Sequence, residues 1–357
     1  MSRRGTSIGW WASSVQPWPV SDDSSGNQIT SGRVDLAVSF AVLFPGQGSQ
    51  FPGMGAELFT ERPDLLGHRA DSILGWSLEE MCLRGSEDAL TRTEHAQPAL
   101  FAVSYALWEE VRARLLSLPA AAAGHSLGEY TALAASGVID FDDALAVVAE
   151  RGQAMADAAD LEPSGMVALL GASLEQAEDI SSRRRAEGGR LTVANVNAPG
   201  QIVLAGGNED LEWLESEAPA LGLRKVVRLK VAGAFHSSFM EPAAARVSQA
   251  LAEVPFHVQM FPVWSNVTAQ PLAEGRERQL LVDQVVSPVR FSQSLEGMAG
   301  AGVELFLHIG PGDVTASMAR RSVAGASAVA ISDLRGIAPG VEAVGTIATP
   351  RPGSLDG

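Results

Sequence analysis

The strongest candidate for chemistry in this sequence is a serine between two glycines. Residues 124–128 read GHSLG, which fits the G-x-S-x-G pattern of a nucleophile elbow with Ser126 at its centre. In that motif a sharp strand-to-helix turn exposes the hydroxyl group, and the small flanking residues relieve crowding. An apolar run at 120–123 precedes the motif and a helical pattern at 127–135 follows it. The N-terminus of that helix would favour a developing oxyanion near Ser126.

A glycine-rich loop, PGQGSQ at residues 45–50, follows the first apolar run of the chain. It does not fit the dinucleotide pattern G-x-G-x-x-G, because Phe51 stands at the third glycine position. Two interpretations remain open from the residues alone. The loop is a plain turn, or its backbone N–H groups face the serine and help to form an oxyanion hole.

A base for the serine must come from one of six histidines. His236 is the candidate, because its loop, GAFHSS at residues 233–238, directly follows an expected strand. His257 and His308 lie in apolar, strand-like surroundings and are predicted to be core residues. No two histidines have close metal-ligand spacing, so no metal site is expected. The sequence NVT at residues 266–268 matches a glycosylation sequon, which we interpret as a chance match without a signal peptide.

The pattern of elements predicts an α/β protein with a small inserted subdomain. Strands at 166–170, 191–196, 201–205 and 224–231 alternate with helices at 174–185 and 209–221 in the order βαββαβ, which is ferredoxin-like. Strand and helix patterns also precede this segment and resume after it, at 260–265 and 305–309. The sequence therefore predicts an α/β-hydrolase-like body with a parallel sheet, interrupted by a ferredoxin-like insertion.

The expected boundaries follow from the same patterns. An irregular N-terminal arm covers 1–37, and the large catalytic subdomain consists of 38–162 and 232–335. The ferredoxin-like subdomain covers 163–231, and residues 336–357, rich in glycine, proline and threonine, are predicted to be a flexible tail.

The composition excludes several classes of protein. The 357 residues include 46% apolar and 19% charged residues, a globular composition, and their net charge of −16 would repel nucleic acid. No apolar run approaches the roughly 20 residues of a membrane-spanning helix. The single cysteine, Cys82, excludes an intramolecular disulfide and is interpreted as a packing residue. We therefore expect a soluble, cytoplasmic protein that binds neither nucleic acid nor a membrane.

Six motifs occur in one order along the chain: PGQGSQ (45–50), QPAL (97–100), GHSLGE (124–129), ERG (150–152), NVNAPGQ (195–201) and AFHS (234–237). Together they resemble the malonyl-CoA:acyl-carrier-protein transacylase family, which includes the acyltransferases of polyketide synthases. The resemblance covers about residues 38–335. It implies an enzyme of fatty acid or polyketide biosynthesis, with no bound cofactor and a CoA thioester as donor substrate.

The resemblance also implies a role for each matched residue. Ser126 would be the nucleophile and His236 its general base and acid, with no third, acidic member of a triad. The backbone carbonyl of Gln284 would orient the histidine instead. Backbone N–H groups of Gln47 and Leu127 would form the oxyanion hole.

The same resemblance implies how the substrates bind. Arg151 would hold the free carboxylate of a malonyl group, while Phe235, His125 and Gln97 would complete the acyl site. A bulky Phe235 leaves little room for an α-methyl branch, which favours malonyl over methylmalonyl groups. The acceptor would be an acidic, phosphopantetheinylated acyl carrier protein. Basic side chains at 183–185 and 224–230 are candidates for docking it.

Three alternatives remain open on the sequence. The first is an acyltransferase for another acyl group, including exchange between two carrier proteins. The second is an editing hydrolase, against which Arg151 counts because editing members of the family tend to lack this arginine. The third is a non-catalytic docking module, against which the intact Ser126 and His236 count.

Overall fold

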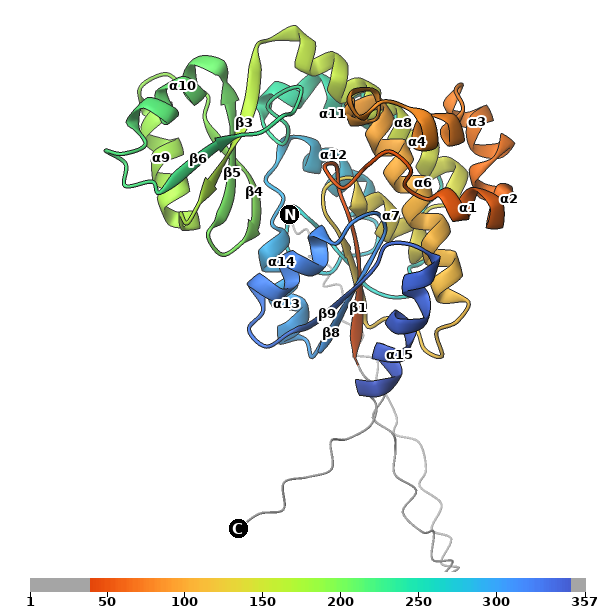
Figure 1. The fold of residues 1–357 in the computed structure, drawn as a ribbon. Helices are drawn as coiled ribbons and strands as arrows, with labels where there is room; N and C mark the ends of the chain where they lie inside the picture. The colour runs from red at the N-terminus through yellow and green to blue at the C-terminus, as the bar shows by residue number, and fades with distance from the viewer. Residues whose placement is uncertain (1–38, 348–357) are drawn as a thin grey trace, which may run out of the picture. The chain divides into compact units, whose positions relative to one another are not determined.

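The computed structural model describes residues 39–347, and these are coloured in Figure 1. The arm expected at 1–37 lies outside the described residues, as do residues 348–357 at the end of the expected tail. None of the helices within 39–347 has the length and apolar character needed to cross a membrane.

A parallel sheet forms the centre of the larger subdomain. Its strands are β1 (Phe40–Phe44), β2 (Ala121–Gly124), β7 (Val263–Trp264), β8 (Leu305–Ile309) and β9 (Ser327–Ile331), in the order β7-β2-β1-β8-β9. Every residue of β1, β2 and β8 is buried, as expected for strands covered on both faces. Because β1 and β2 are parallel neighbours, the loops at 45–50 and 124–128 leave the same edge of the sheet.

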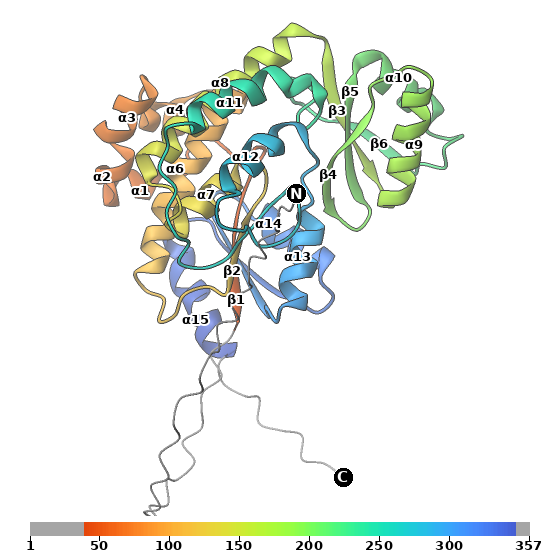
Figure 2. The same cartoon turned by 180° about the vertical axis from the view of Figure 1, so that it is seen from behind.

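Helices cover both faces of this sheet (Figures 1 and 2). The long helices α6 (Thr93–Arg112) and α8 (Phe141–Leu161) pack against each other, and α7 (Gly128–Ala135) leads directly from the loop after β2. The other helices of the larger subdomain are α1 (Ala56–Glu61), α2 (Pro63–Leu66), α3 (His68–Leu74), α4 (Leu78–Arg84), α5 (Glu87–Thr91), α11 (Glu241–Leu251), α12 (Glu277–Val286), α13 (Phe291–Gly300), α14 (Val314–Ser322) and α15 (Ile337–Ile347), with the 3-10 turns η1 (Ser238–Met240) and η2 (Leu334–Gly336).

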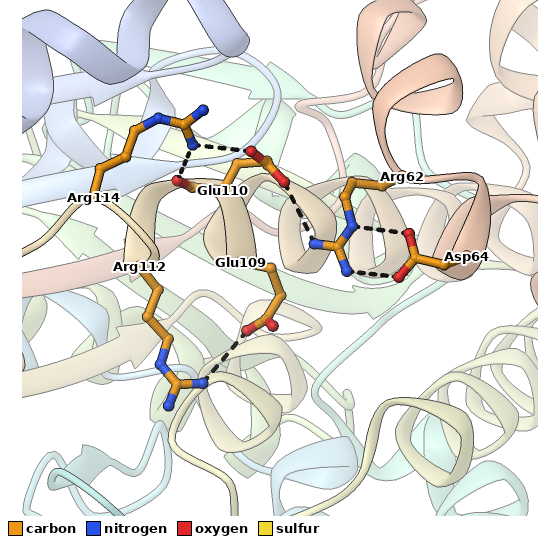
Figure 3. Close-up of polar contacts among 6 residues, drawn as sticks. All are labelled: Arg62, Asp64, Glu109, Glu110, Arg112 and Arg114. Carbon is orange, nitrogen blue, oxygen red and sulfur yellow. Dashed lines mark hydrogen bonds and ion pairs between the residues drawn. The ribbon is translucent and has the colours of Figure 1, made fainter.

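Charged side chains join the exposed end of α6 to α2, as Figure 3 shows. Glu110 lies 2.9 Å from Arg114 and 3.7 Å from Arg62, and Arg62 lies 2.8 Å from Asp64. Surface ion pairs of this kind contribute little to stability, typically about 0–1 kcal/mol each. The apolar faces of the helices therefore dominate their packing.

The smaller subdomain contains an antiparallel sheet in the order β4-β5-β3-β6. Its strands are β3 (Ser164–Leu170), β4 (Thr192–Ala198), β5 (Gln201–Gly207) and β6 (Lys225–Arg228), and its helices are α9 (Leu174–Ala186) and α10 (Asn208–Glu217). Alternate residues of β3 face two different cores: Val167 and Leu169 pack with α9 and α10, and Met166 packs toward the larger subdomain. The ferredoxin-like order predicted from the sequence is confirmed, although β6 is shorter than the expected 224–231.

Backbone hydrogen bonds connect the two subdomains beside β4. The N–H of Val289 donates to the carbonyl of Ala194, and the N–H of Val196 donates to the carbonyl of Val289, both over 2.8 Å. These bonds form an isolated parallel bridge between β4 and the segment that leads into α13. The edge of the small sheet is thereby fixed next to the larger subdomain.

Two predictions from the sequence are wrong. Residues 337–347, assigned to a flexible tail, form α15. Pro339 lies in the first turn, where its missing N–H costs no helix bond, and at Gly340 a Cβ would lie 2.3 Å from Ile331, so the glycine permits close packing on β9. His308 is buried as expected, whereas His257 is exposed in the loop before β7.

Candidate active site

The residues of the GHSLG motif form a sharp turn between β2 and α7. A Cβ at Gly124 would lie 1.8 Å from the carbonyl carbon of Gly128, and a Cβ at Gly128 would lie 2.4 Å from the carbonyl oxygen of Phe44. Only glycine fits at either position. Ser126 itself has φ of 52°, a left-handed conformation that is rare for a residue with a side chain. Within residues 39–347 only two other non-glycine residues have positive φ, and one is His236, at 59°.

The side chains of Ser126 and His236 meet. The Oγ of Ser126 lies 2.9 Å from Nε2 of His236, and Nδ1 of His236 lies 2.8 Å from the backbone carbonyl oxygen of Gln284. Because a carbonyl only accepts, Nδ1 must carry the proton, and Nε2 is left to accept from the serine hydroxyl. Burial, and then the nearby charge of Arg151, lower the pKa of His236 to about 3. The imidazole is thus neutral at neutral pH, as a base for the serine must be.

The guanidinium group of Arg151 lies beside the same hydroxyl group. It comes from α8, is 1% exposed, and donates to the Oγ of Ser126 over 3.0 Å. It also donates to the side-chain oxygens of Gln284, over 2.9 Å, and Gln97. All three acceptors are neutral, and burial lowers the pKa of Arg151 from its usual value. A buried cation bonded to neutral oxygens next to a nucleophile is suited to bind an anionic substrate group.

Ser126, His236, Arg151 and Gln97 line a cavity of about 450 Å³ between the two sheets. Gln47, from the loop after β1, and Leu127 both lie on its wall, and within residues 39–347 the backbone N–H of each meets no acceptor. Phe235 also lines the cavity. Residues from β4 and β5 of the small sheet complete the wall.

His125 connects the serine turn to the small sheet. Its Nε2 lies 2.7 Å from the side-chain oxygen of Asn197 on β4, and its ring meets Phe291 edge-on. Burial lowers the pKa of His125. The residues that the resemblance implied for the acyl site are therefore gathered around one cavity. In the part of the chain that the structure describes, no group of three histidine, cysteine or acidic side chains could hold a metal ion.

Two buried polar residues around Gln284 were missed by the sequence analysis as site residues. The side-chain amide of Gln284 donates to the backbone carbonyl of Ser126 over 2.9 Å and to Oε2 of Glu129 over 2.5 Å. That carboxylate also accepts from the backbone N–H of Asn266 over 3.2 Å. Burial raises the pKa of Glu129 to about 7. The glutamate at the end of GHSLGE was the available signal, whereas nothing near Asn266 in the sequence indicated its place.

The raised pKa of Glu129 predicts a pH-dependent stability difference. An ordinary glutamate in the unfolded chain loses its proton near 4.5, while folded Glu129 keeps it until about 7. The stabilisation from the neutral side chain is thus complete below 4.5 and is lost as pH rises to about 7. The Glu129→Gln variant is always neutral, so its melting temperature relative to wild type should rise across this range. Thermal unfolding at a series of pH values measures it, with exposed Glu79→Gln as control. A constant difference would contradict the expected titration.

Comparison with known proteins shows the family of this chain. Residues 41–341 match the family model described as an acyl transferase domain. The chain belongs to this family. It is 37% identical over 296 residues to a malonyl CoA-acyl carrier protein transacylase of Bacillus subtilis, covering 82% of this chain and 93% of that relative. It is also 38% identical over 315 residues to the polyketide biosynthesis protein ThaF of Burkholderia thailandensis, covering 87% of this chain but 26% of that longer protein.

Solved structures of acyl transferases have the same fold as this one. A malonyl-CoA:acyl carrier protein transacylase from Xanthomonas oryzae superimposes with a TM-score of 0.81 at 34% identity, covering 85% of this chain and 98% of that one. A malonyl-transacylase solved with its type II polyketide synthase acyl-carrier protein gives a TM-score of 0.81 at 35% identity, covering 85% and 99%. The predicted fold class, a parallel α/β body with a small antiparallel insertion, is confirmed.

Proposed function

We propose that this acyltransferase moves a malonyl group from CoA to the phosphopantetheine thiol of an acyl carrier protein, through an ester on Ser126. The relatives named above as malonyl CoA-acyl carrier protein transacylases support this substrate pair. The observation that supports the proposal most directly is the pair of groups that contact the hydroxyl oxygen of Ser126. The Oγ of Ser126 lies within hydrogen-bond distance of both a neutral imidazole and a buried guanidinium group.

The first half-reaction forms the ester. His236 Nε2 takes the proton of Ser126 Oγ while that oxygen attacks the thioester carbonyl of malonyl-CoA. The backbone N–H groups of Gln47 and Leu127 donate to the oxyanion that develops. The C–S bond then breaks, and the leaving CoA sulfur takes this proton from His236, which leaves CoA as a thiol and the malonyl group on Ser126.

The second half-reaction repeats these steps with the carrier protein. Its phosphopantetheine thiol gives a proton to His236, and the sulfur attacks the ester carbonyl. The ester bond to Ser126 breaks, and the serine oxygen recovers the proton. The carbonyl of Gln284 fixes the imidazole tautomer in both directions, and as a neutral acceptor it places no negative charge near the malonyl carboxylate.

The carboxylate of the malonyl group would bind Arg151. In the free protein the guanidinium donates to neutral oxygens, so exchanging one of them for a carboxylate gains a charge-assisted pair. The planar group can bind both carboxylate oxygens at once, which a lysine could not reproduce.

Basic side chains near the cavity would receive the acidic carrier protein. Among those expected to do so, Arg184 and Arg228 form ion pairs with Asp210 and Glu215. Lys230 instead is exposed and lines the cavity, where it can meet an acidic partner. We also propose that the protein is located in the cytoplasm, as expected from the sequence.

The Arg151→Ala variant tests the substrate assignment. Malonyl loading from CoA should fall about ten- to a hundredfold, because a hydrogen bond to a charged group contributes about 1.5–3 kcal/mol. Acetyl loading should stay equal or improve, since acetyl-CoA has no carboxylate. Single-turnover loading of both donors, followed by intact mass, measures this change in specificity.

Exposed Arg84→Ala on α4 is the matched control and should change neither rate. Equal losses for both donors in a variant of normal melting temperature would show that Arg151 is not the carboxylate receptor. Release of free malonate faster than transfer would instead favour the hydrolase alternative.

A further inference from the structure

The side chain of Asn266 holds the backbone on both sides of the serine turn. Its Oδ1 accepts from the N–H of Ser126 over 2.7 Å, and its Nδ2 donates to the carbonyl of Gly124 over 2.7 Å. Asn266 follows β7, the strand beside β2, and is 0% exposed. One amide therefore uses its acceptor and its donor on two points of the turn that bears the nucleophile.

Such a support is needed because Ser126 has an unfavourable backbone conformation. A non-glycine residue at φ of 52° is strained and persists only where the surroundings fix it. The two bonds from Asn266 fix the peptide groups before His125 and before Ser126. The N–H of Ser126 already donates to Asn266, so it cannot also donate to an oxyanion. The donors to the oxyanion are therefore the N–H groups of Gln47 and Leu127.

Asn266 is itself held in place by its backbone. Its N–H donates to Oε2 of Glu129, and its carbonyl accepts from the N–H of Arg290 over 2.9 Å. The same carboxylate accepts from the side chain of Gln284, which also bonds Arg151 and whose backbone carbonyl bonds the histidine. Asn266 thus connects the serine turn, through Glu129, to Gln284, whose carbonyl orients His236.

We propose that Asn266 is a positioning residue for acyl transfer, which keeps the Oγ of Ser126 in reach of His236 Nε2. The proposal rests on the function argued above, since it assigns Asn266 to that reaction. In the sequence, Asn266 stands out only as part of a chance match to a glycosylation sequon. The side chain of Asn266 contacts neither Ser126 Oγ nor His236 Nε2. Its loss should therefore lower kcat and leave the KM for malonyl-CoA nearly unchanged.

The Asn266→Ala variant tests this role. We expect kcat for malonyl transfer to fall about a hundredfold, the effect of a misplacement near 1 Å, with KM for malonyl-CoA within about twofold of wild type. The rate constant for labelling Ser126 with a fluorophosphonate should fall by the same factor. In that reaction the serine oxygen displaces fluoride from phosphorus and His236 takes its proton, so no malonyl site is involved. Exposed Thr268→Ala, on the same loop, is the control and should match wild type.

The Asn266→Asp variant covers the case in which the alanine variant does not fold. It has nearly the same volume and keeps the acceptor for the N–H of Ser126. Burial favours the protonated carboxyl group, whose O–H can donate to the carbonyl of Gly124 in place of the amide, so we expect a smaller loss, about tenfold. Labelling rate constants near wild type for a folded variant would overturn the proposal, as would a rise in KM without a fall in kcat. Wild-type protein that labels at Ser126 but does not load malonyl would contradict the proposed function alone.

Discussion

The Ser126→Ala variant is expected to form no acyl-enzyme with malonyl-CoA, whereas wild-type protein gains the mass of one malonyl group. The hydroxyl that lies 2.9 Å from His236 Nε2 is replaced by a methyl group, which cannot attack a thioester. No thiolate can substitute for it, because the one cysteine, Cys82, is buried and burial raises the pKa of its thiol to about 12. Intact mass after incubation with the donor measures the outcome.

Ser49→Ala is the matched control. Ser49 lies on the wall of the same cavity, on the loop after β1, whereas the imidazole of His236 is hydrogen-bonded to Ser126 and Gln284. This variant should load as wild type does, and both variants should melt normally because each loses only a hydroxyl group. An acylated Ser126→Ala protein would refute the assigned nucleophile.

The serine turn was predictable because its geometry demands particular residues within a short segment. Gly124 and Gly128 have no room for a Cβ, so the local sequence carries the shape of the turn. The parallel sheet and the ferredoxin-like insertion were likewise predictable, since apolar runs and helical periods record which faces are buried. For the same reason the apolar run directly before the loop at 45–50 forms the buried strand β1.

Asn266 and Glu129 were not predictable as site residues from local pattern. Asn266 lies 140 positions after Ser126 in the sequence. The two residues meet only because β7 and β2 are adjacent strands of the sheet. Glu129 lies on a helix that is buried on every side, so no polar face marked it. The helix α15 was missed because residues 336–357 are rich in glycine, proline and threonine. Pro339 is tolerated because it lies in the first helical turn, and Gly340 allows close packing on Ile331.

Loss of the imidazole is expected to cause the second large effect. The His236→Ala variant should load malonyl groups about 10²–10⁴-fold more slowly than wild type, the usual contribution of a general base. The remaining reaction has no base beside the hydroxyl group, so hydroxide must remove the proton. Its rate should rise about tenfold per pH unit, because the concentration of hydroxide does so. Single-turnover loading of the variant across a pH series measures both effects.

The pH profile of malonyl loading by wild-type protein should differ from that of the His236→Ala variant, and this difference makes the test specific for the base. His236 should contribute no inflection to the loading rate near the ordinary histidine value of 6.5, because burial and the charge of Arg151 lower its pKa to about 3. Added imidazole should restore part of the loading rate of the His236→Ala variant, since the truncated side chain leaves space next to Ser126. A structural role for His236 predicts the opposite pattern: a variant with a lowered melting temperature, a profile parallel to wild type and no response to imidazole. That pattern would remove the base from the proposed mechanism while leaving Ser126 as the site of acylation.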